Sequence, residues 1–149
     1  MVVVNIQGRL GNQMFGFALY RQLVKMGKEV YADFSHEPLI DFFGFQYDVI
    51  DKETALEYLK DRNNRNIIKR WEYRIFPQRC RCYEEKATGV FDKNVLKLDD
   101  VYLNGYWQSE KYFADVTEEV RQMYGFPDFY TDYQKKMLDE IENKQSAVL

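Results

Sequence analysis

The start of the chain carries four segments in a fixed order: a β-branched run, a loop with two glycines, a helical stretch and a second β-rich run. Val2-Val3-Val4-Asn5-Ile6 is typical of a buried parallel strand. Apolar residues then recur at helical spacing, and Gly27 is expected to end that helix at the C′ position. A second strand is expected at 29–33, so the pattern predicts a βαβ unit, which is almost always parallel and right-handed. The fold class is therefore α/β.

Composition sets limits on this α/β fold. A chain of 149 residues suits one domain, and a net charge of −3 disfavours general nucleic-acid binding. A membrane span needs roughly 20 apolar residues in a row, and the chain has no such run and no basic segment typical of a signal peptide. Cys80 and Cys82 lie too close to pair, and with His36 as the only histidine they cannot complete a structural zinc site. We expect reduced thiols, no metal, and a location in the cytoplasm or at the inner face of its membrane.

The middle of the chain predicts shorter elements. The aromatic segment 41–47 is expected to be a loop that plugs an apolar surface, and 51–59 a short helix with Ala55, Leu56 and Leu59 on its buried face. The basic segment 60–81 has two interpretations. It is either a helix whose apolar residues (Ile67, Ile68, Trp71 and Ile75) face the core before Pro77 ends it, or a nucleic-acid contact.

The last third predicts one strand and two helices. Residues 101–107 alternate as a strand does, which places Tyr106 and Trp107 on opposite faces. A helix is expected at 111–124, with Ser109 as its N-cap and Gly125 and Pro127 after its end. A second helix is expected at 131–143, and residues 146–149 are typical of the first residues of another strand.

The loop between the first strand and the first helix is the sharpest candidate site. A helix N-terminus after a strand offers backbone N–H groups to an anion, and Gly8 and Gly11 let backbone approach a ligand closely. Arg9 could contact phosphate, while the Asn12 and Gln13 amides could bind sugar hydroxyls. The spacing matches neither a dinucleotide fingerprint nor a P-loop. A tight structural turn is the alternative.

The longer string around this loop carries a family resemblance. Gly8-Arg9-Leu10-Gly11-Asn12-Gln13-Met14-Phe15, followed by Phe17-Ala18-Leu19, closely resembles the N-terminal motif of the bacterial α-1,2-fucosyltransferases, glycosyltransferase family 11. The string from Leu103 to Phe113 resembles the strand–helix signature near the end of that family's first half. Tyr83-Glu84-Glu85 and Phe91-Asp92 fit its looser pattern, so the resemblance spans nearly the whole chain.

The resemblance implies transfer of L-fucose from GDP-L-fucose to the 2-hydroxyl of a terminal galactose, with inversion and without a metal or other cofactor. It implies two Rossmann-like halves of GT-B type facing across a cleft. The His-x-Arg-Arg-x-Asp motif, whose arginine binds the donor pyrophosphate in that family, is absent from this sequence. We therefore expect residues 1–149 to be the N-terminal, acceptor-side domain without the donor-binding half. This domain would be inactive alone and would self-associate through the face that the missing half covers.

The same resemblance suggests which residues bind substrate. Arg9, Asn12 and Gln13 would meet donor or acceptor at the carboxyl edge of the sheet, together with Gly8 and Gly11. Tyr106 and Gln108 are expected at a second strand end, where they could stack on a sugar or bind its hydroxyls. Glu110 is expected beside them, or simply as a first-turn helix charge.

The catalytic base stays open between His36 and Asp33, with Glu37 comparable, because a carboxylate or histidine must reach the acceptor hydroxyl. The alternative functions are a non-catalytic carbohydrate-binding module, a nucleotide-binding module that uses only the 8–13 loop, and RNA binding through 60–81.

Overall fold

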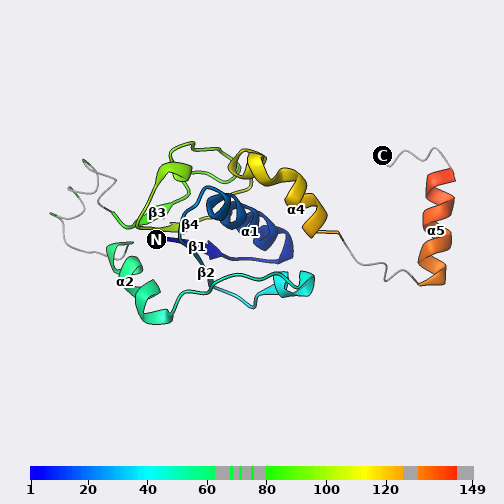
Figure 1. The fold of residues 1–149 in the computed structure, drawn as a ribbon, viewed down its shortest axis with the longest axis horizontal. Coiled ribbons are helices and arrows are strands. Elements are labelled where there is room, and N and C mark those ends of the chain that lie inside the picture. Colours follow the sequence, from blue (N-terminus) through cyan, green and yellow to red (C-terminus); the bar gives the residue numbers. More distant parts are fainter. Residues whose placement is uncertain (63–67, 69–70, 72–74, 76–79, 126–130, 144–149) are drawn as a thin grey trace.

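A computed structural model describes residues 1–62, 68, 71, 75, 80–125 and 131–143 (Figure 1). Its strands are β1 (Val2–Ile6), β2 (Val30–Phe34), β3 (Cys82–Glu84) and β4 (Val101–Asn104). Its α-helices are α1 (Leu10–Lys25), α2 (Lys52–Arg62), α4 (Thr117–Met123) and α5 (Asp132–Asn143). Three 3-10 helices complete the described elements: η1 (Leu39–Phe43), η3 (Val95–Lys97) and η4 (Glu110–Val116).

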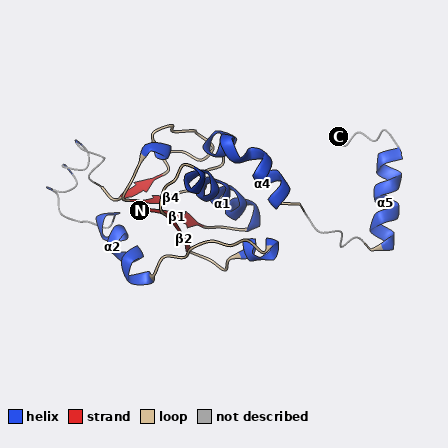
Figure 2. Ribbon diagram, viewed as in Figure 1, coloured by secondary structure: helices blue, strands red, loops and turns tan. Residues whose placement is uncertain are grey.

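The four strands form one parallel sheet in the order β2-β1-β4-β3 (Figure 2). Val2 is the register partner of Val30 on one side and of Val101 on the other, so β1 is an inner strand. Residues 48–50 extend the β2 edge, because Ala32 N–H donates to Asp48 O and Ile50 N–H donates to Ala32 O. The fold is α/β with a parallel sheet and flanking helices, as the sequence predicts.

Alternate residues of the strands pack against different helices. One face of β1 carries Val2, Val4 and Ile6, which pack in a core with residues of α1, η4 and α4. The other face carries Val3, which packs with Tyr102 and Cys82 of the neighbouring strands and with Ala55 and Tyr58 of α2. Both faces of the sheet are therefore covered, as a parallel sheet requires.

The predicted βαβ unit is confirmed, with β2 shifted by one residue to 30–34. Helix α1 ends at Lys25, and Gly27 follows with φ +79°, the left-handed conformation of a C′ glycine. The backbone N–H of Lys28 donates to Leu23 O, which closes the last turn of the helix. The aromatic segment 41–47 also packs as expected, since Phe45 stacks on Phe17 at a centroid distance of 4.6 Å.

Two expectations for the middle of the chain are wrong, the first only in part. The predicted helix is α2, with Ala55 buried and Leu59 partly buried as expected, but Leu56 is 59% exposed and Tyr58 is buried in its place. In segment 60–81, Ile68, Trp71 and Ile75 are exposed and do not face the core. Ile67 and Pro77 of the same prediction lie outside the described residues.

The last third follows the predicted elements with different ends. Strand β4 ends at Asn104, three residues before its predicted end, because Trp107 adopts a left-handed φ of +56° and the Tyr106 N–H bonds to the Glu85 side chain. The helix expected at 111–124 is η4 followed by α4, with a break at Phe113. Ser109 stands at the N-cap but makes no side-chain capping bond.

Two further predictions concern the residues after α4. Helix α5 matches the prediction for 131–143 and leaves Tyr133, Met137 and Ile141 exposed. The strand predicted at 146–149, like Pro127, lies outside the described residues.

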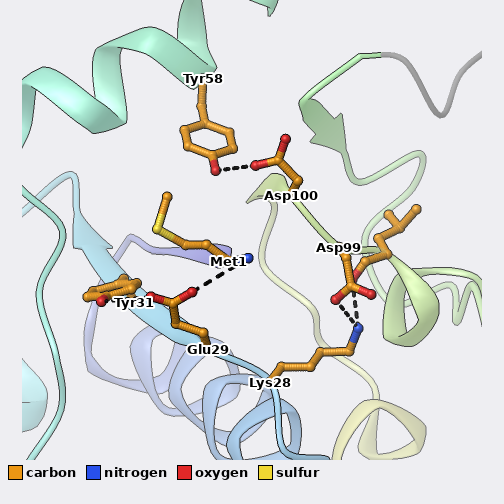
Figure 3. Close-up of polar contacts among 8 residues, drawn as sticks. Met1, Lys28, Glu29, Tyr31, Tyr58, Asp99 and Asp100 are labelled. Atoms are coloured by element: carbon orange, nitrogen blue, oxygen red, sulfur yellow. Dashed lines mark hydrogen bonds and ion pairs between the residues drawn. The ribbon is translucent and has the colours of Figure 1, made fainter.

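Side-chain contacts tie the strand starts together at the amino edge of the sheet (Figure 3). Lys28 Nζ donates to Asp99 Oδ1 at 2.6 Å and to Leu98 O at 2.9 Å, which joins the start of β2 to the start of β4. The Tyr58 hydroxyl donates to Asp100 Oδ1 at 2.6 Å and so fixes α2 to the same turn. Burial, and then the Asp100 carboxylate, raise the pKa of Tyr58 to about 12.

This raised pKa predicts a loss of stability at high pH. The pKa of Tyr58 is about 12 in the folded protein against 10.0 for an ordinary tyrosine, so its stabilising effect is complete below pH 10 and is lost as the pH rises from 10 to 12. Urea unfolding of the wild type and of Tyr58→Phe across this range should show a shallower decline for the variant. An equally steep decline in both proteins would contradict the assignment to Tyr58.

Candidate functional site at the carboxyl edge of the sheet

The carboxyl ends of the parallel strands meet at one edge, where open α/β sheets bind their ligands. The loop 7–9 leaves this edge after β1, residues 35–36 leave it after β2, and residues 105–108 leave it after β4. Two of these segments carry the strings that resemble the fucosyltransferase motifs. The topology therefore places the predicted site residues on neighbouring strands.

The β1–α1 loop depends on Gly8. Gly8 has φ +81°, and a Cβ at this position would lie 2.6 Å from Asn12 Nδ2, so both backbone conformation and space require glycine. Arg9 occupies the N-cap position with an exposed side chain, and Gly11 is exposed with open space around it. The first turn of α1 has no acidic residue and no side-chain cap. Its positive dipole end is therefore not neutralised from within the helix.

Gln13 has its hydrogen-bond partners inside the protein. The side chain is fully buried, and its Nε2 donates to Gly8 O at 3.0 Å and to Glu37 O at 2.8 Å. Its Oε1 accepts from the Ile40 N–H at 3.3 Å. Whereas the sequence suggests a ligand contact, the structure gives Gln13 the role of fastening the glycine loop to the segment after β2.

A hydrogen bond joins the two motif segments. Gln108 Nε2 donates to Asn12 Oδ1 at 2.7 Å, across 96 positions of sequence. Tyr106, 37% exposed, and Glu110, exposed at the start of η4, flank Gln108 on the β4 side. Trp107 is fully buried while Tyr106 is exposed, but strand alternation is not the cause, because β4 ends at Asn104. The structure thus brings Gly8, Arg9, Asn12 and Gln108 together, with Tyr106 and Glu110 on the adjoining segment.

Two of the three candidate bases, His36 and Asp33, have different surroundings. His36 Nδ1 accepts from the Gly8 N–H at 3.4 Å, so the imidazole lies at the glycine loop and is exposed there. Asp33 Oδ2 accepts from the hydroxyl of buried Tyr102 at 2.6 Å, on the sheet face that α2 covers. Of these two, only His36 contacts the loop.

A line of polar side chains at this edge is not among the features expected from the sequence. Ser35 Oγ donates to Asn5 Oδ1 at 2.8 Å, Asn5 Nδ2 donates to Asn104 Oδ1 at 2.7 Å, and Asn104 Nδ2 donates to Glu84 Oε1 at 3.0 Å. The line runs from Ser35, directly after β2, through β1 and β4 to β3. Its only signal in the sequence is an asparagine near the end of each of two apolar strands.

Comparison with protein-family models, with curated proteins and with solved structures finds no match. Among the described residues, no group of three His, Cys, Asp or Glu side chains is placed to hold a metal ion. A search of the same residues finds no helix long and apolar enough to cross a membrane.

Proposed function

We propose that this chain forms the N-terminal, Rossmann-like part of a galactoside α-1,2-fucosyltransferase of GT-B type. Such an enzyme transfers L-fucose from GDP-L-fucose to the 2-hydroxyl of a galactose-terminated glycan, with inversion and without a metal. The observation that carries the proposal is the Gln108–Asn12 hydrogen bond of 2.7 Å. It joins two strings that resemble the same family at the edge where open α/β sheets bind their ligands.

In this proposal the loop residues bind the polar parts of the substrates. Arg9 and the N-terminus of α1 attract the negative charge of the GDP leaving group, since neither is neutralised by a first-turn carboxylate. The amides of Asn12 and Gln108 bind sugar hydroxyls, Tyr106 stacks on a sugar face, and Glu110 borders the site. Gly8 and Gly11 give the substrates close access to backbone, while Gln13 holds the loop in place.

Inverting transfer needs a base on the acceptor side. The base takes the proton of the 2-hydroxyl as that oxygen attacks the anomeric carbon, and the bond to the GDP oxygen breaks with its electron pair. We favour His36 over Asp33 for this role, because His36 lies at the glycine loop whereas Asp33 is bonded to Tyr102. The acceptor hydroxyl would replace the Gly8 N–H, 3.4 Å away, at His36 Nδ1, and this nitrogen would take the proton.

NMR titration of the ¹⁵N-labelled chain tests the proposal. Lactose alone should shift the amides of Gly8, Arg9, Gly11 and Asn12 if this part of the enzyme holds the acceptor. Shifts with GDP-fucose but none with lactose would instead favour a nucleotide-binding module, an alternative that the uncapped N-terminus of α1 and exposed Arg9 also suit. If neither ligand shifts these amides, the acceptor-side proposal is wrong for this chain.

Arg9→Ala gives a prediction for the charge of the loop. Loss of a guanidinium–phosphate contact should weaken GDP binding by about tenfold, since such a contact contributes roughly 1.5 kcal/mol or more. Arg121→Ala is the matched control, because Arg121 is exposed in α4 and pairs with Glu118. Calorimetric titration with GDP measures both variants. Equal affinities for GDP in Arg9→Ala and in the wild type would remove Arg9 from the site.

A further inference from the structure

A cavity lies beside the candidate site, between the β3 and β4 ends and the segment 86–94. Its volume is about 440 Å³, within the range of small-molecule sites. Aromatic residues form much of its wall: Tyr83, Phe91, Trp107 and Tyr112. Apolar rings around a few polar groups are the usual lining of a ligand pocket.

Two lining residues carry buried polar atoms that have no hydrogen-bond partner. They are Glu85 Oε1 and Trp107 Nε1, which are the atoms of this kind found among the described residues. Trp107 itself is fully buried. Each unpaired buried group of this type costs about 1–3 kcal/mol, so native proteins rarely keep them without a reason.

The two side chains are held close together over Gly105. A Cβ on Gly105 would lie 2.9 Å from Glu85 Oε2 and 3.1 Å from Trp107 Cε2, the ring carbon bonded to Nε1. The second carboxylate oxygen, Glu85 Oε2, accepts the Tyr106 N–H at 2.7 Å and so fixes the carboxylate. Trp107 has a left-handed φ of +56° here, which is uncommon for a bulky residue.

The opposite wall of the cavity is fixed by its own contacts. Lys86 Nζ and the Tyr83 hydroxyl both donate to Asp92 Oδ2, at 2.8 and 2.7 Å, and these bonds hold the pKa of the Asp92 carboxyl below its usual range. The Tyr112 hydroxyl donates to Val90 O and accepts from the Asp92 N–H. Lys86 and Asp92 are therefore paired at this wall. Lys93 lines the same cavity, so the two carboxylates (Glu85 and Asp92) and the two ammonium groups of the lining balance in charge.

The chemistry of the two unpaired atoms selects the ligand. An anion could accept from the Trp107 N–H but would be repelled by the Glu85 carboxylate, while an ammonium group could not accept from the indole. A hydroxyl group does both, because it donates to Glu85 Oε1 and accepts from Trp107 Nε1. We propose that this cavity binds a neutral sugar through a hydroxyl held between Glu85 and Trp107. The inference does not require fucosyl transfer, since it rests on Glu85, Trp107 and the aromatic wall alone.

The indole N–H resonance of Trp107 reports on the site directly. The chain has two tryptophans, so Trp71→Phe identifies the Trp107 signal in ¹⁵N spectra. Methyl β-D-galactopyranoside should shift the Trp107 indole signal saturably, and inorganic phosphate should not. No shift with the galactoside, with L-fucose or with glucose would overturn the proposal, as would an equal response to phosphate.

Glu85→Gln tests the carboxylate. Loss of a charge-assisted hydrogen bond should weaken sugar binding by about tenfold. Glu84→Gln is the matched control, because Glu84 is the adjacent glutamate, is exposed and bonds to Asn104 outside the cavity. Equal weakening in both variants would count against the site.

If Glu85→Gln fails to fold, nuclear Overhauser effects in the wild-type chain decide. Contacts between the Trp107 indole proton and sugar protons would support the proposal, and contacts only elsewhere on the protein would overturn it. The same spectra separate this proposal from the fucosyltransferase proposal, which is read at the amides of Gly8, Arg9, Gly11 and Asn12.

Discussion

Gly105→Ala is expected to destabilise the protein by about 3 kcal/mol, near the upper end for overpacking. The new Cβ would lie 2.5 Å from Glu85 Cβ, an atom that cannot move without its backbone. That backbone is itself fixed, because the Glu85 N–H donates to Asn104 O at 2.9 Å. Relief of the clash must therefore separate β4 from the segment that follows β3, and urea unfolding followed by circular dichroism measures the loss.

The matched control is Gly11→Ala. Gly11 lies in the first turn of α1 and is exposed, and the space around it within 4 Å is open to an added methyl group. Alanine in a helix is favoured over glycine by about 0.5–1 kcal/mol, so this variant should be slightly more stable than the wild type. If Gly105→Ala were as stable as Gly11→Ala, the close packing of Glu85 and Trp107 over Gly105 would be incorrect.

The second large effect is expected for Gln13→Ala, at about 3 kcal/mol of lost stability. The substitution removes three hydrogen bonds at once and leaves a cavity where a fully buried side chain was. Gly8 O and Glu37 O lose their amide donor, so the glycine loop and the segment after β2 lose their connection. Thermal unfolding measures the loss.

Gln108→Ala is the control for this variant. Gln108 is half-buried, and its side chain makes one hydrogen bond, to Asn12. Its removal should cost about 1 kcal/mol in stability. Equal losses of stability for Gln13→Ala and Gln108→Ala would show that Gln13 does not fasten the loop.

Features with local causes were predictable from the sequence. The run of valines, the helical spacing after it and Gly27 are consecutive in the chain, so they define β1 and α1 without knowledge of the rest of the fold. The positions of Arg9 and Asn12 at the carboxyl edge follow from the same unit. Helix α5 matches for the same reason, because its pattern is contained within 12 residues.

Features that depend on distant partners were not predictable in this way. The early end of β4 results from Glu85, whose side chain accepts a hydrogen bond from the Tyr106 N–H. The two residues are twenty-one positions apart in the sequence. The buried position of Gln13 depends on its hydrogen bonds to the backbone of Glu37 and Ile40. Both residues lie outside the motif that contains Gln13, so the motif alone does not predict these bonds. Leu56 follows the helical spacing expected of the buried positions of α2. The position of α2 on the sheet decides that Tyr58 is buried and Leu56 is exposed.

The polar line through Asn5 and Asn104 also bears on how the sheet finds its correct alignment. Val2, Val3 and Val4 are interchangeable in size and shape, so packing alone would tolerate a β1 strand displaced along its neighbours. A shift by one residue would turn Asn5 toward the apolar face packed by α1, away from Asn104 and Ser35. A buried amide without a partner costs about 1–3 kcal/mol, and the valines on either face gain nothing from the shift that would offset it. During folding, Asn5 and Asn104 therefore favour the native register of β1 over a register shifted by one residue. The three valines cannot do so, because they are identical.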